Sequence, residues 1–178
     1  MNVCAQYLNT SSVELNEVRR IYEQSFPLDE RREYSCLIDM LSDNKYFTLE
    51  ALYLSHEVVG MFSSWMIDGW RYIEHFAIEA SCRGRGIGRE VLRNYLLRSH
   101  EPVVLEVELP TDFQSRRRID FYCSMGFVLH DKYRYIQPSY GDGRNAVEML
   151  LMTYGAPADC NLDELSRLLH AEVYGVRV

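Results

Sequence analysis

One short stretch of the sequence combines the residue types that bind phosphate groups. Two arginines and three glycines lie together there, in the order Arg83-Gly84-Arg85-Gly86-Ile87-Gly88, and a segment with helical spacing of apolar residues follows. The first amides of a helix lack an intrahelical partner, and the helix dipole favours negative charge at that end. Glycine has no Cβ, so a phosphate can approach its backbone closely. The stretch therefore predicts a site for the diphosphate of a cofactor or substrate.

The residues around this stretch narrow the kind of phosphate binder. A strand is expected over 70–78 and a helix over 86–98. A P-loop has Lys and then Ser or Thr after its last glycine, and this chain has Arg89 after Gly88, which excludes that motif. The dinucleotide fingerprint needs a third glycine where Arg89 stands, although Glu106 lies where an acidic residue would bind the ribose. A dinucleotide-binding protein is therefore kept as a weaker alternative.

Hydrophobic periodicity predicts an α/β (α+β) chain whose sheet begins antiparallel. Besides the two elements already named, strands are expected over 3–8, 46–54, 58–67, 103–109, 127–136 and 146–153, and helices over 31–41, 115–125 and 162–173. A further helix is expected to begin at a cap on Ser11 or Ser12 and to end at Phe26. Asn161 is expected to cap the last helix, and Asp68-Gly69 indicates a hairpin turn.

Composition places the chain among globular proteins of about one domain. It has 178 residues, of which 47% are hydrophobic and 25% are charged, with a net charge of −7. An acidic chain is a poor candidate for nucleic-acid binding, so its clustered arginines predict a small anionic ligand. No apolar stretch approaches the ~18 residues of a membrane span, and no signal peptide is visible. The five scattered cysteines predict free thiols in the cytoplasm, and the five scattered histidines predict no metal site.

Two segments together resemble the GNAT superfamily of acyl-CoA-dependent N-acetyltransferases. Arg83-x-x-Gly86-x-Gly88 is similar to the family's Arg/Gln-x-x-Gly-x-Gly/Ala signature, and the sequence at 121–127, FYCSMGF, resembles its late FYxxxGF turn. The resemblance covers about residues 11–153. It implies a mixed, mostly antiparallel central sheet, splayed between strands 4 and 5 and flanked by helices. We expect a GNAT-like domain over 1–154 and a helical extension over 155–178, packed on the same domain or on a partner.

The resemblance also implies acetyl-CoA as the cofactor and assigns residues to it. The backbone of Phe76, Ala77 and Ile78 would pair with the pantetheine arm. The pyrophosphate would be wrapped by Arg83, Gly84, Arg85, Gly86, Ile87, Gly88 and Arg89. The family often has an asparagine at the start of the following helix, and here Ser115 would take over part of that contact.

The chemistry of amide formation requires a base and an acid. An amine near pKa ~10 is protonated at neutral pH and cannot attack a thioester until a carboxylate accepts its proton. Glu74, on the fourth strand, is the predicted base, and Glu106 and Glu108 compete with it. Tyr122 is the predicted acid for the departing thiolate. The structural alternatives are a carboxylate paired with an arginine at Glu74 and a core tyrosine at Tyr122.

The expected activity is transfer of an acetyl group from acetyl-CoA to a primary amine of a small molecule or peptide, by direct attack in a ternary complex. A non-catalytic acyl-CoA-binding regulatory module is the alternative from another class. Neither a nucleic-acid nor a membrane partner is expected, and a homodimer stays open. Tyr133, Tyr135 and Tyr140 surround a polar loop expected near the acceptor, although ordinary packing is favoured for two of them. His75 is expected to be a packed histidine rather than a base.

Overall fold

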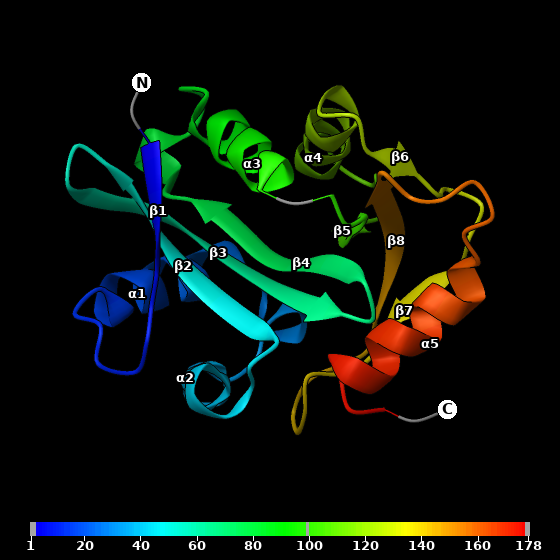
Figure 1. Ribbon diagram of the computed structural model, residues 1–178, viewed down its shortest axis with the longest axis horizontal. Helices are drawn as coiled ribbons and strands as arrows, with labels where there is room; N and C mark the ends of the chain where they lie inside the picture. The colour runs from blue at the N-terminus through cyan, green and yellow to red at the C-terminus, as the bar shows by residue number, and fades with distance from the viewer. Residues whose placement is uncertain (1–2, 99, 177–178) are drawn as a thin grey trace. The chain divides into compact units, whose positions relative to one another are not determined.

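The computed structural model describes residues 3–98 and 100–176 (Figure 1). The strands are β1 (Val3–Tyr7), β2 (Phe47–Leu54), β3 (Glu57–Ile67), β4 (Trp70–Ile78), β5 (Val103–Glu108), β6 (Val128–Leu129), β7 (Tyr135–Gln137) and β8 (Val147–Tyr154). The α-helices are α1 (Leu15–Ser25), α2 (Tyr34–Asp43), α3 (Ile87–Leu97), α4 (Phe113–Ser124) and α5 (Leu162–Glu172). Two short 3-10 turns, η1 (Leu28–Glu30) and η2 (Ala80–Cys82), connect them.

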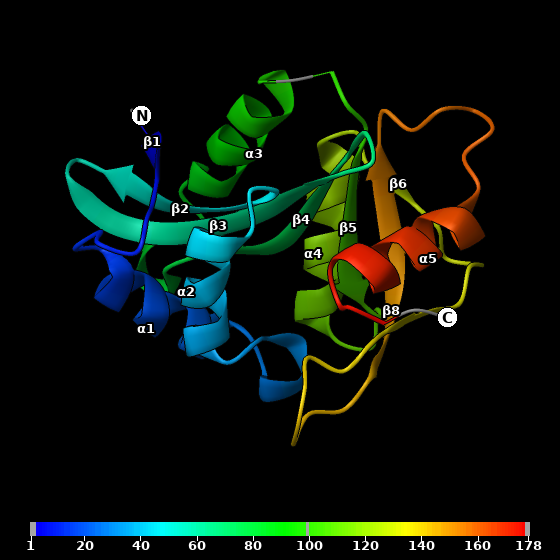
Figure 2. The same ribbon diagram turned by 60° about the horizontal axis from the view of Figure 1, so that its bottom comes forward.

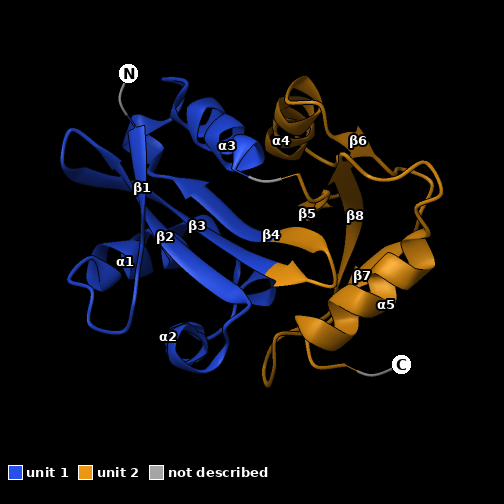
Figure 3. Ribbon diagram, in the orientation of Figure 1, with its two compact units in different colours: residues 1–65, 73–99 blue, residues 66–72, 100–178 orange. Residues whose placement is uncertain are grey.

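The strands form one mixed, mostly antiparallel sheet in the order β1-β2-β3-β4-β5-β8-β6, with β7 also paired to β8. The pairs β1–β2 and β2–β3 are antiparallel, as are the pairs of β5, β6 and β7 with β8. The predicted fold class is therefore confirmed. The chain divides into two compact units, residues 1–65 with 73–99 and residues 66–72 with 100–178 (Figure 3).

The first unit contains β1, β2, most of β3 and β4, and three α-helices. Helices α1 and α2 lie against one face of these strands and α3 lies against the other (Figure 2). The buried stripe of α1, Val18, Ile21 and Tyr22, has the spacing that places side chains on one helix face. Burial of that stripe anchors a helix whose mean composition is otherwise polar.

Two helix starts in this unit differ from the prediction by more than one residue. The serine caps are wrong, because Ser12 Oγ accepts the amide of Asn9 at 2.9 Å in a preceding turn, and α1 begins only at Leu15. The second helix begins three residues later than predicted. Arg31 has an extended backbone, and the amide of Arg32 donates to Tyr22 Oη at 2.8 Å, which holds this segment outside the helix.

The second unit contains the start of β4, the strands from β5 to β8, and helices α4 and α5. The predicted continuous strand over 127–136 is wrong, because it is broken into β6 and β7. Val128 pairs with Thr153 and Tyr135 with Met149. The chain advances seven residues on one side and four on the other, so three residues must leave the ladder between the two strands.

The last helix packs on strands of its own chain. Leu165, Leu169 and Val173 are buried, as a stripe with helical spacing requires. His170 Nε2 lies 3.0 Å from the carbonyl oxygen of Ile136 on β7. The predicted cap is confirmed, since the Asn161 side chain accepts the amides that open α5.

Candidate active site

The end of β4 and the start of α3 build an open loop of backbone amides. Gly84 and Gly86 have φ values of +76° and +81°, which side chains rarely adopt, and a Cβ on either would meet nothing within 4 Å. Gly86 is the N-cap of α3, and no side chain caps the helix. Open space and uncapped first amides are what a phosphate group requires. The loop therefore fits the pyrophosphate of a cofactor.

The arginines of this loop are exposed, and one of them contacts the end of β4. Arg83 Nε donates to the carbonyl oxygen of Ile78 at 2.8 Å, so its guanidinium lies beside the end of the strand. Arg85 and Arg89 are exposed on the same segment. The predicted residues from Phe76 to Arg89 thus come together in the first unit, with positive charge around the amides.

A glycine that sequence reasoning missed brings β3 against the end of β4. A Cβ on Gly60 would lie 2.5 Å from the carbonyl oxygen of Ala77 and 3.0 Å from side-chain atoms of Ile78 and Leu52. Glycine inside an apolar strand is a signal of close backbone approach, and that signal is present in the sequence. Gly60 therefore helps to place the backbone that is predicted to pair with pantetheine.

Glu74 lies on β4, with its side chain fully buried and both carboxylate oxygens bound. Arg32 Nε lies 2.9 Å from Oε1, and Trp65 Nε1 donates to Oε2 at 2.9 Å. Burial raises the pKa of Glu74, but the guanidinium of Arg32 and the bond from Trp65 outweigh it and hold this pKa below its usual value. The carboxylate is therefore ionised, and it is a weak base in this surrounding.

His75 is packed, as predicted. Its side chain is buried, its Nδ1 lies 3.3 Å from Ser63 Oγ, and its Nε2 lies 3.1 Å from the carbonyl oxygen of Glu30. The rings of Tyr22 and Phe26 contact it edge-on. Burial lowers the pKa of His75, so the imidazole is neutral at physiological pH.

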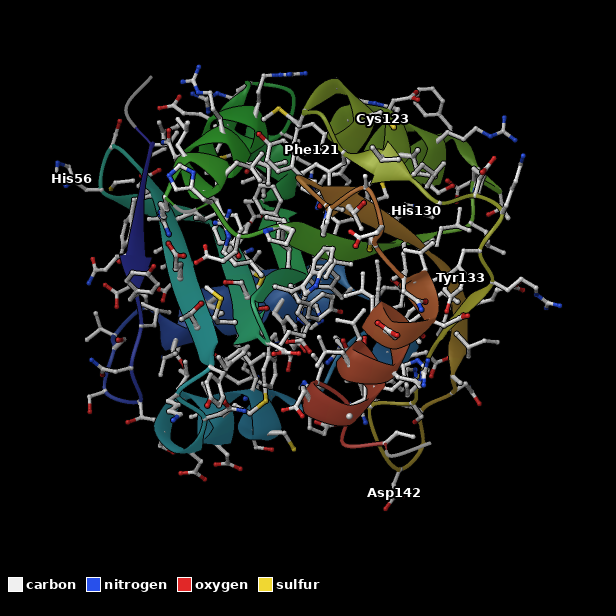
Figure 4. The ribbon with its side chains drawn as sticks, turned by 45° about the vertical axis from the view of Figure 1, so that its right-hand side comes forward. His56, Phe121, Cys123, His130, Tyr133 and Asp142 are labelled. Carbon is white, nitrogen blue, oxygen red and sulfur yellow. The ribbon has the colours of Figure 1, made fainter. Side chains whose placement is uncertain are left out.

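In the second unit, α4 carries the predicted acid and the predicted pantetheine contact. Tyr122 is buried, its ring contacts Phe121 and Phe127, and burial raises its pKa to about 12. Among the described residues no hydrogen bond to its hydroxyl is present. Ser115 is buried and forms a capping box with Asp112, which occupies its hydroxyl. Figure 4 labels Phe121 and Cys123 on this helix.

The two other candidate carboxylates lie on β5, in the same unit. Glu108 forms an ion pair with Arg118 of α4. Glu106 accepts two tyrosine hydroxyls, from Tyr135 to Oε1 at 2.5 Å and from Tyr174 to Oε2 at 2.8 Å. The alternating sequence of this strand predicts Glu106 and Glu108 on one face. Both residues are partly exposed and Val107 between them is buried, which is consistent with that prediction.

The hydroxyl of Tyr174 extends this network to two further tyrosines. It lies 3.2 Å from the hydroxyl of Tyr72 and 3.3 Å from that of Tyr140. The rings of Tyr140 and Tyr174 are also in contact, with their centroids 5.0 Å apart. Tyr133, labelled in Figure 4, donates to a different carboxylate, that of Asp163 on α5, at 2.9 Å. Sequence reasoning singled out Tyr140 and Tyr135 but missed Tyr72 and Tyr174, because nothing in the local pattern distinguishes them from the other tyrosines.

Other kinds of site are not formed by the part of the chain that the structure describes. Over residues 3–98 and 100–176, no group of three or more His, Cys, Asp or Glu side chains is arranged to hold a metal ion. No described helix has the length and apolar character to cross a membrane. The five cysteines are all free thiols.

Comparison with known proteins identifies the family. The sequence model of the acetyltransferase (GNAT) family matches residues 15–127. A solved protein assigned to the GNAT family, from Bacteroides thetaiotaomicron, is 31% identical, with a TM-score of 0.89 over 98% of this chain and 99% of that one. No curated protein matches the sequence.

Two structures solved with acetyl-CoA share the fold at lower identity. NAA60 of Arabidopsis thaliana is 17% identical, with a TM-score of 0.65 over 86% of this chain and 98% of that one. A GNAT acetyltransferase of Elizabethkingia anophelis is 16% identical, with a TM-score of 0.60 over 86% and 97%. With an uncapped glycine loop ahead of α3 and a family match over most of its length, this chain belongs to the GNAT family of acetyltransferases.

Proposed function

We propose that the chain transfers the acetyl group of acetyl-CoA to a primary amine of a small molecule or peptide, by direct attack of the amine in a ternary complex. The observation that carries this proposal is the uncapped start of α3 behind Gly84 and Gly86, whose positive φ and open surroundings suit a pyrophosphate. The proposal excludes nucleic acid as a partner on the ground of the chain's net charge of −7.

The residues proposed to hold the cofactor lie mainly in the first unit. The backbone of Phe76, Ala77 and Ile78 would pair with pantetheine, and the loop from Arg83 to Arg89 would take the pyrophosphate. Arg83 already reaches the carbonyl oxygen of Ile78, so its side chain links the two parts of this surface. Ser115 stays a prediction, with its hydroxyl engaged by Asp112.

When bound, acetyl-CoA supplies the thioester that an amine can attack. Tyr122 is proposed to donate the proton of its hydroxyl to the leaving sulfur. Burial raises the pKa of Tyr122 to about 12, so the hydroxyl keeps its proton at neutral pH until a stronger base is near. The contacts of its ring with Phe121 and Phe127 fix the direction of that hydroxyl.

The three candidate bases differ in what holds them. Arg32 and Trp65 bind both oxygens of Glu74, and Arg118 pairs with Glu108. Glu106, in the second unit, accepts the neutral hydroxyls of Tyr135 and Tyr174, and such donors lower the basicity of a carboxylate less than a guanidinium does. We therefore propose Glu106 as the group that accepts the proton of the amine and assign Glu74, predicted first, to holding β4.

Cofactor binding is tested by placing a side chain in the loop. Gly86→Val should weaken acetyl-CoA binding more than tenfold, because it strains the backbone and closes the space above the first amides of α3. Gly69→Val is the matched control, since Gly69 has φ +77° and equally open surroundings in a turn outside the loop. Calorimetry gives the two dissociation constants, and equal affinities in both variants would contradict the assignment of the loop.

Turnover is tested by release of the free thiol of CoA with a panel of primary amines. Acetyl-CoA at about 100 times its dissociation constant should stabilise the wild-type fold by ~2.7 kcal/mol, and amines should then release thiol. Absence of any thermal shift at millimolar acetyl-CoA would overturn the proposed function. Binding without thiol release across the panel would favour the alternative, a regulatory module that binds acyl-CoA.

A further inference from the structure

We infer that Tyr174, which lies beyond the residues matched by the family and beyond α5, is a positioning residue for Glu106 in acetyl transfer. The inference rests on the proposed function and deepens it, because it assigns a role to the C-terminal segment. Tyr174 Oη donates to Glu106 Oε2 at 2.8 Å, across 68 positions of sequence. The match to the family's sequence model ends at residue 127, so Tyr174 lies outside the residues matched by that model and contacts the strand that carries the proposed base.

The direction of the protons follows from the chemistry of the groups. An ionised carboxylate only accepts, so both Tyr135 and Tyr174 donate to Glu106. A tyrosine hydroxyl has one proton, and that of Tyr174 is used for Glu106. In their contacts with Tyr174, at 3.2 and 3.3 Å, Tyr72 and Tyr140 therefore act as donors. The network is polarised toward one carboxylate.

The packing of Tyr174 fixes where its hydroxyl points. Its ring lies 5.0 Å from the ring of Tyr140 and 6.4 Å from that of His170, and the preceding residue, Val173, is buried at the end of α5. The α5 helix is itself held on β7 by His170. The side chain that carries this hydroxyl is therefore held in place by its neighbours. A group that orients a catalytic carboxylate needs such support.

Several titratable groups surround Glu106 in this unit. Tyr135 comes from β7, Tyr72 from the start of β4 and Tyr140 from the loop before β8. His170 of α5 has its ring 5.4 Å from that of Tyr135, and burial lowers its pKa, so it is neutral near pH 7. On β5 the next side chain of the same face is Glu108, which is paired with Arg118. Burial and the charge of Glu106 raise the pKa values of Tyr135 and Tyr174, which keep their protons.

Tyr135 and Tyr174 both donate to Glu106, and donated hydrogen bonds favour the charged form of a carboxylate. Removing one donor favours the neutral acid, and a bond to a charged group is worth enough to move the titration by about one pH unit or more. That shift is specific to a bond with Glu106. A purely structural role of Tyr174 would change the melting temperature and leave the titration of Glu106 in place.

The first experiment needs no acceptor. The side-chain carboxyl ¹³C signal of Glu106, assigned with Glu106→Gln, is titrated in the wild type, in Tyr174→Phe and in the control Tyr133→Phe. The control loses a hydroxyl that donates to a carboxylate in the same unit, but to Asp163 rather than Glu106. We expect an upward shift of about one unit or more in Tyr174→Phe and none in Tyr133→Phe. An unshifted titration in Tyr174→Phe overturns the inference.

The second experiment uses the amine that releases most thiol in the panel. In Tyr174→Phe the acidic limb of the kcat/KM profile should move up by the same amount as the ¹³C titration, while the dissociation constant of acetyl-CoA stays at its wild-type value. A limb that stays in place although the ¹³C titration moves overturns the inference, because Tyr174 would then tune a carboxylate that does not take the proton.

Further controls distinguish the loss of the Tyr174 hydroxyl from misfolding of a variant and from failure of the proposed function. Tyr174→Leu removes the hydroxyl with different packing, and it should give the same two shifts if the hydroxyl is what matters. Circular dichroism confirms that each variant is folded before titration. A wild-type protein that binds acetyl-CoA but acetylates no amine would contradict the proposed function, whereas wild-type turnover with unshifted profiles in Tyr174→Phe and Tyr174→Leu contradicts the role of Tyr174 alone.

Discussion

Glu74 in the first unit and Glu106 in the second are each bound through both carboxylate oxygens, and their donors differ. In the first unit a guanidinium and an indole hold Glu74, whose side chain is 0% exposed. In the second unit the hydroxyls of Tyr135 and Tyr174 hold Glu106, which is partly exposed. A permanent positive charge stabilises the anion so strongly that it resists protonation, whereas neutral donors leave it able to accept a proton.

This difference is the basis for assigning Glu74 to structure and for proposing Glu106 as the base. The bonds to Glu74 come from the segment before α2, at Arg32, and from β3, at Trp65, so they tie three parts of the first unit together. The bonds to Glu106 come from β7 and from the end of the described chain. Its position on the strand next to the predicted cofactor surface favoured Glu74 as the base. The chemistry of the hydrogen-bond donors favours Glu106 in that role.

The largest expected effect compares the two glutamates in turnover. Glu106→Gln should lower kcat by about 10²- to 10⁴-fold, the usual contribution of a general base. Glu74→Gln should change kcat far less, because the buried amide would still accept a hydrogen bond from Arg32 or Trp65. Single-turnover acetylation of the best amine at saturating acetyl-CoA measures both. The reverse order of effects would return the role of base to Glu74.

The second prediction breaks the ion pair of the first unit. Arg32→Ala should destabilise the fold by about 3–5 kcal/mol, because it leaves the charge of Glu74 buried without its cation. Arg118→Ala is the control, since its pair with Glu108 is partly exposed on both sides and such pairs contribute about 0–1 kcal/mol. Urea unfolding gives the two free energies. Equal losses would mean that Glu74 is better hydrated than its burial indicates.

The smallest expected effect is a pH dependence of stability. The folded state lowers the pKa of Glu74 below the unfolded value of about 4.3, so its contribution is complete above that pH and is lost as the pH falls through the lower folded pKa. The unfolding free energy of the wild type minus that of Glu74→Gln should therefore be constant from pH 7 to 5 and shrink below about pH 4.3. A difference that stays constant down to pH 3 would contradict the lowered pKa.

Local patterns in the sequence were sufficient to predict the elements that carry the proposed cofactor surface. The strand at 70–78 has the predicted bounds, and Gly69 forms the turn before it with a positive φ. The amphipathic helix after the glycine loop begins at Ile87, one residue later than predicted. These features depend on turn chemistry and on periodicity, both of which lie within a few residues of sequence.

The surroundings of the two glutamates could not be predicted in the same way. Arg32 is 42 positions from Glu74, and Tyr174 is 68 positions from Glu106. No periodicity links residues so far apart, and one of thirteen tyrosines carries no local mark of its partner. The prediction of one continuous strand over 127–136 was wrong for a related reason. The three extra residues between β6 and β7 become visible only in the register of these strands with β8.

The absent side chain at Gly60 sets a limit on how this protein can be redesigned. Even a single methyl group there would clash with the carbonyl oxygen of Ala77. The close spacing between β3 and the end of β4 therefore requires glycine at position 60. Laboratory evolution toward bulkier acyl donors must leave this position alone. Room for longer chains has to be created where flexible side chains, rather than a carbonyl, form the boundary.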